Sequence, residues 1–249
     1  MKNRVLPYSF AAVLVAGALS AVTVPTISWK TGDRSRPLPP KVNPGNATTA
    51  PSDAVVLFDG KDLSAWQQKN GKPVEWTVGD GYFTVKPKSG DLTTKQAFGD
   101  SQIHIEWASP TPSHGKDQEP GNSGVFLHGL YEIQVLESNE NVTYADGQAG
   151  AIYCQYPPLV NPARTAGEWQ IYDIVFHGPR FDAAGQLTRL ATVTILFNGV
   201  LVQDNVSPTG PTDYMKRPPY KPGPDKLPLV LQDHGQAVKY RNVWIRELK

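Results

Sequence analysis

Carboxylate and amide side chains alternate with apolar side chains in residues 131–138. In an extended strand successive side chains point to opposite faces, so Glu132, Gln134 and Ser138 would share one face. Polar groups are costly to bury unless they form hydrogen bonds, which indicates that this face binds a polar ligand. A sugar fits, because its hydroxyl groups need many donors and acceptors at once. We expect Glu132 to be a general acid or base and Gln134 to bind substrate.

A second polar face is expected in residues 102–108, where His104 and Glu106 alternate with apolar residues. If this strand lies beside residues 131–136, Glu106 and Glu132 would share one concave surface, and their repulsion would raise at least one pKa. We therefore expect Glu106 to be catalytic and His104 to bind substrate. The alternative is an ordinary hydrated outer face. As a metal site the pair is a weak signal, because no third ligand lies nearby.

Two further motifs place polar side chains beside glycines. Asn122 and Ser123 lie between two glycines, where the backbone can approach a ligand closely or simply form a tight turn. Gln232 and His234 come at the end of an expected strand, just before another glycine. Imidazole groups ordinarily titrate near neutral pH, so His234 is the best candidate for a general acid or base. We expect Asn122, Ser123 and Gln232 to bind substrate.

An acid and an aromatic residue open the expected strand 168–177. Glu168 and Trp169 together could form a platform for a sugar ring. Core packing is the competing interpretation of Trp169, because large aromatic side chains are usually mostly buried. We expect both Glu168 and Trp169 to bind substrate.

The elements that must position these residues have a period of two. Short alternating runs are separated by turn residues, and the 23 prolines and 22 glycines disfavour long helices. Asn198-Gly199 predicts a type I′ hairpin between strands 193–197 and 200–204. Another strand is expected at 149–154. The pattern is typical of an all-β sandwich or jelly roll, with long loops at 109–121, 156–167 and 207–226 that we expect to rim one face.

The N-terminal part of the chain differs in composition from the rest. A basic start, an apolar run and small residues predict a signal peptide over residues 1–21; a retained anchor is the alternative. Residues 22–52 read as a proline-rich linker, and 53–249 as one domain. The net charge of +1 gives no reason to expect nucleic acid or an acidic membrane as partner. The single cysteine, Cys154, excludes an intrachain disulfide.

Seven short blocks carry a recognisable order and spacing: Leu57–Trp66, Gly121–Phe126, Tyr131–Leu136, Gly150–Tyr153, Gly167–Gln170, Leu231–Gly235 and Tyr240–Arg246. Together they resemble the 3-keto-disaccharide hydrolase domain family. The resemblance covers 54–248 and implies a concanavalin A-like jelly-roll β-sandwich, exported by bacteria, that cleaves glycosides whose sugar carries a ketone at carbon 3. Tyr153 lies in one block and is added as substrate-binding. Cys154 stands where glycine is expected.

The chemistry that the resemblance implies suits these side chains. A ketone at carbon 3 acidifies the proton on carbon 2, so that a carboxylate or imidazole can remove it. An amide or hydroxyl can hold the enolate oxygen, and a general acid can release the aglycone from carbon 1 before water adds back. We expect no cofactor, and the role of a divalent metal stays open. A carbohydrate is the expected partner, a secreted or periplasmic location is expected, and no stable membrane insertion follows signal cleavage.

Two other functions compete with this interpretation. Residues 132–137 also resemble the acidic motif of family 16 retaining glycosidases, but the middle acid is Gln134 here, and Glu137 would need a β-bulge to reach the same face. The other alternative is a carbohydrate-binding module without catalysis, because many sandwiches of this shape only bind sugars.

Overall fold

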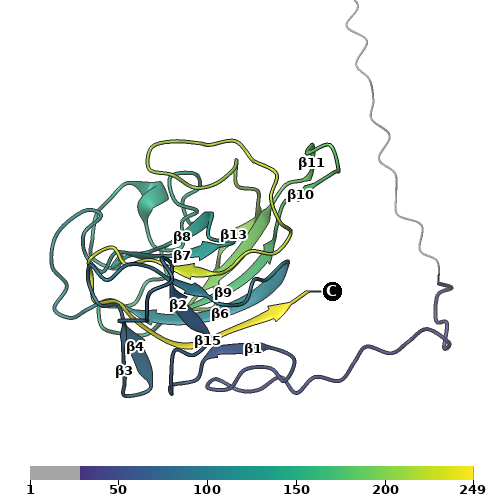
Figure 1. Ribbon diagram of the computed structural model, residues 1–249, viewed down its shortest axis with the longest axis horizontal. Coiled ribbons are helices and arrows are strands. Elements are labelled where there is room, and N and C mark those ends of the chain that lie inside the picture. Colours follow the sequence, from purple (N-terminus) through teal and green to yellow (C-terminus); the bar gives the residue numbers. More distant parts are fainter. Residues whose placement is uncertain (1–28, 249) are drawn as a thin grey trace, which may run out of the picture. The chain divides into compact units, whose positions relative to one another are not determined.

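Two antiparallel sheets form the body of the protein in the computed structural model, which describes residues 29–248 (Figure 1). The expected signal peptide, residues 1–21, lies outside the described residues. Residues 42–248 belong to one compact unit. This unit includes residues 42–52, which the composition assigned to the linker. Asn43 and Ser52 are hydrogen-bonded within it, and Asn242 donates to the Ala47 carbonyl at 3.2 Å.

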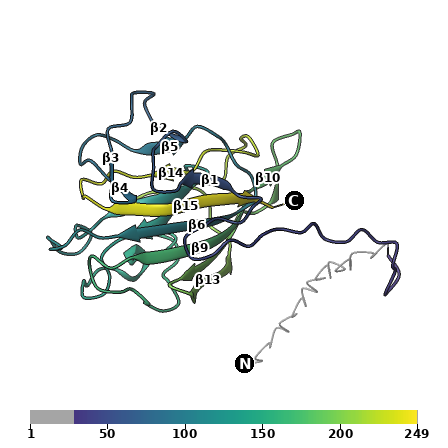
Figure 2. The ribbon, with the colours of Figure 1, turned by 90° about the horizontal axis from the view of Figure 1, so that it is seen from below.

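The larger sheet has eight strands. Its order is β13-β12-β9-β6-β15-β4-β3, and β1 also pairs with β15. Figure 2 shows β15, β6 and β9 side by side at the centre of this sheet. The strands are β1 (Val55–Phe58), β3 (Thr77–Gly79), β4 (Tyr82–Thr84), β6 (Ser101–Ala108), β9 (Gln170–His177), β12 (Thr192–Phe197), β13 (Val200–Val206) and β15 (Lys239–Glu247).

The smaller sheet has five strands in the order β2-β5-β14-β7-β8. A separate two-stranded ribbon and one 3-10 turn complete the described structure. The smaller sheet contains β2 (Trp66–Gln68), β5 (Leu92–Thr94), β7 (Ser123–Leu127), β8 (Tyr131–Val135) and β14 (Val230–Leu231); the ribbon is β10 (Arg180–Phe181) with β11 (Leu187–Arg189), and the turn is η1 (Ala145–Gly147).

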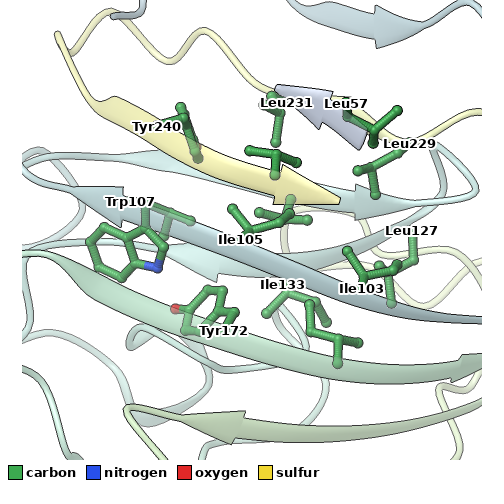
Figure 3. Packing of buried hydrophobic residues seen from close by; sticks show 14 of the residues in the cluster. Leu57, Ile103, Ile105, Trp107, Leu127, Ile133, Tyr172, Leu229, Leu231 and Tyr240 are labelled. Carbon is green, nitrogen blue, oxygen red and sulfur yellow. The ribbon is translucent and has the colours of Figure 1, made fainter. Parts of the chain in front are cut away.

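The hydrophobic core lies between the two sheets. Alternate residues of β6, including Ile105 and Trp107, and of β8, including Ile133, belong to one buried cluster. Figure 3 shows these side chains together with Tyr172 of β9 and Leu127 of β7. Burial of so much apolar surface is the main force that holds such a sandwich together. The predicted all-β, concanavalin A-like jelly-roll sandwich is confirmed.

The hairpin predicted at Asn198-Gly199 is also confirmed. Phe197 pairs with Val200, and both turn residues have positive φ, 52° for Asn198 and 79° for Gly199. A type I′ turn needs positive φ at both central positions, and Asn-Gly supplies this at low cost. The hairpin joins β12 and β13 at the edge of the larger sheet.

Residues 149–154 do not form the expected strand. They make local contacts along the edge of β8 instead: the amide of Gln134 donates to the Ala151 carbonyl at 3.0 Å, and the amide of Tyr153 donates to the Glu132 carbonyl at 3.1 Å. Cys154 follows with φ of 54°, a left-handed conformation in which glycine is the usual residue. This conformation gives a physical reason for the glycine expected at that position.

Candidate active site

The β7–β8 hairpin presents Glu132 and Gln134 on the face of the smaller sheet that points away from the core. The two strands pair in register without a bulge, so Ile133 faces the core and its neighbours face outward. All five residues of β8 are nevertheless buried. Loops cover the outer face: Gln118 accepts a hydrogen bond from Gln134 Nε2 at 2.8 Å, and Thr212 Oγ1 accepts one from the Glu132 amide at 2.9 Å.

These loops and the hairpin enclose a cleft of about 470 Å³. The cleft contains six of the expected site residues in one place. Those six are Asn122, Glu132, Gln134, Tyr153, Gln232 and His234, and the other lining residues are Asp117, Gln118, Phe126, Tyr144, Thr212, Asp213 and Tyr214.

Gly124 provides the space that the Glu132 carboxyl occupies. A Cβ atom at Gly124 would lie 2.4 Å from Glu132 Oε1 and 2.8 Å from Cε2 of Phe126. A Cβ atom does not approach other heavy atoms this closely, so any larger residue would displace the acid. The second glycine of the Asn122-Ser123 motif is thus required for space beside the acid.

Burial raises the pKa of Glu132 to about 8, and the charge of Asp91 adds a smaller effect in the same direction. No residue within 29–248 donates a hydrogen bond to the Glu132 carboxyl. Desolvation disfavours the charged form of a carboxyl group, so Glu132 is mostly protonated at neutral pH. A buried neutral carboxyl in a cleft is suited to donate a proton to a bound molecule.

Other polar groups in the cleft lack partners. Gln134 Oε1 and Gln232 Oε1 are buried, and neither has a hydrogen-bond partner among the described residues. Buried acceptors without partners are rare in folded proteins. Together with Glu132 they make a surface that is ready to receive the hydroxyl groups of a ligand.

Glu106 and His104 do not share this cleft, so the expected convergence of Glu106 with Glu132 is wrong. Both lie on β6 of the larger sheet, whereas Glu132 belongs to the smaller one. Glu106 accepts hydrogen bonds from Arg241 Nε at 2.7 Å and Asn242 Nδ2 at 2.8 Å. The raised pKa of Glu132 comes chiefly from burial, with no repulsion from Glu106.

Glu106 and His104 belong to a network of charged groups that stabilises the structure. Burial alone would raise the pKa of Glu106, but hydrogen bonds from His104, Asn242 and Arg241 outweigh it and hold the pKa at about 2. Burial alone would lower the pKa of His104, but Asp173 and Glu106 raise it to about 9. A larger cavity of about 580 Å³ lies over this network. The Glu106 carboxylate is already paired with Arg241 and Asn242, so Glu106 is a poor base.

Three other expected binding residues also lie outside the cleft lining. Ser123 is fully buried, and its hydroxyl donates to the Gln232 carbonyl at 2.6 Å and lies 2.7 Å from the Tyr240 hydroxyl. Glu168 is exposed and accepts the Thr165 amide at 3.0 Å. Trp169 is half-buried, stacks on the Arg241 guanidinium at 4.1 Å, and belongs neither to the cleft nor to the described core cluster.

Two of the three long loops rim the cleft. Loop 109–121 contributes Asp117 and Gln118, and loop 207–226 contributes Thr212, Asp213 and Tyr214, whereas no described residue of 156–167 lines it. Tyr144 comes from a shorter segment before η1. Only the lengths of the loops pointed to these residues in the sequence, because loop residues carry no periodicity.

The acidic motif that resembles retaining glycosidases is not assembled here. β7 and β8 pair without a bulge, and Glu137 Oε1 instead accepts the amides of Asn139 and Glu140 at 2.8 and 3.3 Å. Glu137 therefore shapes a turn and does not line the cleft. Retaining chemistry needs two carboxyl groups about 5–5.5 Å apart, and this motif does not supply the second one.

Residues 29–248 contain no group of three or more His, Cys, Asp or Glu side chains arranged to hold a metal ion. They also contain no helix long and apolar enough to cross a membrane.

Comparison with known proteins gives a consistent result. Residues 53–246 match the model of the 3-keto-alpha-glucoside-1,2-lyase-like domain. A crystal structure from Parabacteroides distasonis ATCC 8503, described provisionally as a glycosyl hydrolase, is 47% identical with a TM-score of 0.84, covering 88% of this chain and 95% of that one. A second protein of that organism, with the same description, is 20% identical with a TM-score of 0.58 and covers 79% of this chain and 94% of its own. At this identity the likeness shows the fold alone. No curated protein matches.

Proposed function

Because the chain belongs to the 3-keto-alpha-glucoside-1,2-lyase-like domain family, we propose that it cleaves glycosides whose sugar carries a ketone at carbon 3. The observation that supports this most directly is Glu132, a buried carboxyl with its pKa raised to about 8 inside a cleft that also holds unpartnered amide oxygens. Perturbed titration in a polar cleft is characteristic of catalytic sites. The name given to the 47% identical protein from Parabacteroides also supports glycoside cleavage.

The proposed reaction begins at carbon 2. A base removes the proton there, the electrons of that bond form a double bond between carbons 2 and 3, and the ketone oxygen becomes an enolate. When the carbon 3 carbonyl re-forms, a double bond forms between carbons 1 and 2, and the bond from carbon 1 to the aglycone oxygen breaks. That oxygen takes a proton from a general acid. Water then adds a hydroxyl to carbon 1 and a proton to carbon 2, which gives the free 3-keto sugar.

We assign Glu132 as the general acid and His234 as the base. Glu132 holds its proton at neutral pH and can give it to the aglycone oxygen. His234 is exposed at the rim of the same cleft, where its imidazole nitrogen can accept the carbon 2 proton. Asn122, Gln134, Tyr153 and Gln232 are proposed to bind the sugar; the amide oxygens of both glutamines are free to accept from its hydroxyl groups. The assignment requires no cofactor.

Export belongs to the same proposal. The basic and apolar pattern of residues 2–21 supports a signal peptide, and a secreted or periplasmic enzyme would meet glycosides from the surroundings. Mass spectrometry of the mature protein from the native host should therefore find a chain that lacks these residues.

The test of the function uses two substrates that differ at one carbon. The full chain is incubated with a 3-keto glucoside and, separately, with the same glucoside carrying a hydroxyl at carbon 3. We expect release of the aglycone from the first and none from the second, because only the ketone acidifies the carbon 2 proton. Cleavage of the unoxidised glucoside would support an ordinary glycosidase. Binding of both without turnover would support a carbohydrate-binding module.

A further inference from the structure

Two tyrosine hydroxyls meet inside the cleft. The hydroxyl oxygens of Tyr144 and Tyr153 lie 2.7 Å apart, and both side chains are partly buried and line the cleft that holds Glu132. Their rings are tilted by 51° with centroids 6.3 Å apart, so the contact between them is made through the hydroxyl groups. Neither tyrosine belongs to the hydrophobic core cluster.

The local backbone holds both rings in place. The amide of Tyr153 donates to the Glu132 carbonyl, which fixes Tyr153 beside the acid. Tyr144 precedes η1 and packs against Gly147, where a Cβ atom would lie 2.3 Å from Cε2 of the Tyr144 ring. Gln118 Nε2 donates to the Gly147 carbonyl at 3.0 Å and closes the same corner. The pair is therefore preorganised before any ligand binds.

Both hydroxyls carry their protons at neutral pH. Burial raises the pKa of Tyr144 to about 12, and burial together with the neighbouring Tyr144 raises that of Tyr153 further. A pair of neutral phenols that share one hydrogen bond keeps one further O–H to donate. The cleft thus contains a fixed neutral donor near a fixed neutral acid.

We propose that the Tyr144–Tyr153 pair donates a hydrogen bond to the carbon 3 oxygen of the substrate and stabilises the enolate that forms there. This inference rests on the proposed function, because only a substrate that enolises develops charge on that oxygen. Donors fixed before the reaction stabilise the developing charge without reorganising. No proton is transferred to the oxygen; the tyrosines act by hydrogen bonding, while the base takes the carbon 2 proton.

The test separates enolisation from cleavage. The substrate is a 3-keto sugar with two hydrogens at carbon 1, which has a removable carbon 2 proton but no aglycone to lose. Exchange of that proton in deuterated water is followed by NMR with the full chain. We expect Tyr144→Phe and Tyr153→Phe each to slow exchange by roughly 10²–10³-fold, the usual effect of losing one such donor, with sugar affinity changed far less. The double variant should be little slower than the slower single variant, because the hydroxyls act as one unit.

Tyr220→Phe is the matched control. The Tyr220 hydroxyl is likewise held by hydrogen bonds, donating to the Pro208 carbonyl at 2.5 Å and accepting from the Ala191 amide at 3.2 Å, but Tyr220 does not line the cleft. It should keep the exchange rate of the parent protein. Parent-like exchange in both Tyr144→Phe and Tyr153→Phe would overturn the tyrosine assignment and leave the function standing. A parent protein that neither exchanges this sugar nor cleaves 3-keto glycosides would overturn both.

Discussion

Replacing Glu132 by glutamine should lower turnover of a 3-keto glycoside by at least ~10²-fold, the usual scale for losing a general acid. The amide keeps the size of the side chain and its place on β8, but it cannot give a proton to the aglycone oxygen. In the parent protein turnover should fall as the pH rises through about 8, where Glu132 loses its proton. The variant should lack this alkaline decline. The measurement is steady-state aglycone release from pH 5 to 10.

Unfolding experiments show whether the loss is chemical or structural. The native state holds the Glu132 proton up to pH about 8, whereas an unfolded glutamate releases it near 4.5. The part of the parent protein's free energy of unfolding that depends on Glu132 is therefore fully present below pH 4.5. It declines as the pH rises above 4.5, and the loss is complete once the pH has passed 8. The full difference is at most on the order of 5 kcal/mol. Urea unfolding should show this decline in the parent and not in Glu132→Gln.

Two outcomes would contradict the role given to Glu132. Turnover that rises through pH 8 would make the ionised carboxylate the active form, and Glu132 would then be the base. A Glu132→Gln variant that is folded and turns over at the parent rate would remove Glu132 from the mechanism.

Replacing His234, at the rim of the same cleft, by alanine should lower the turnover of a 3-keto glycoside by about 10²-fold, because the variant lacks the proposed base.

Gly124→Ala should lower turnover by about 10²-fold although it adds one methyl group. The new Cβ would overlap Glu132 Oε1, at 2.4 Å, and the ring of Phe126, at 2.8 Å, so the acid must move. A displacement of about 1 Å in a catalytic group costs on the order of 10²-fold in rate. Overpacking should also destabilise the fold by about 1–3 kcal/mol. Aglycone release and urea unfolding measure the two effects.

Gly79→Ala is the control for this substitution. Gly79 is the last residue of β3, its φ lies outside the left-handed region, and a Cβ atom there would meet no atom within 4 Å. It should leave turnover unchanged. Because Gly124 acts through the acid, the double variant Gly124→Ala with Glu132→Gln should be no slower than Glu132→Gln alone. Additive losses would mean that Gly124 has a separate role.

The sequence predicted the architecture well because the relevant signals are local. Strict alternation placed Ile105 and Ile133 in the core, and Asn198-Gly199 determined one hairpin. The same alternation placed Glu132 and Gln134 on one face of β8. Each of these depends on neighbouring residues along one strand, which a sequence shows directly.

The position of Glu106 could not be predicted in the same way. Alternation shows which side chains share a face, but it does not show which sheet the strand joins. β6 pairs with β9 and β15, which start more than 60 residues later, and this brings Arg241 and Asn242 to Glu106. Tyr144 and Asp213 were missed for a related reason, because irregular loops place them and no pattern in the sequence records where a loop folds.

Cleavage of a 3-keto glucoside in deuterated water tests the central claim most directly. The product is analysed by NMR at the earliest times, and the free 3-keto sugar incubated with the protein alone sets the background for exchange after release. If the bond breaks through loss of the carbon 2 proton, the first product formed carries deuterium at carbon 2, above that background. A product that retains the original proton at carbon 2 would contradict the account, because the aglycone would then have left without enolisation.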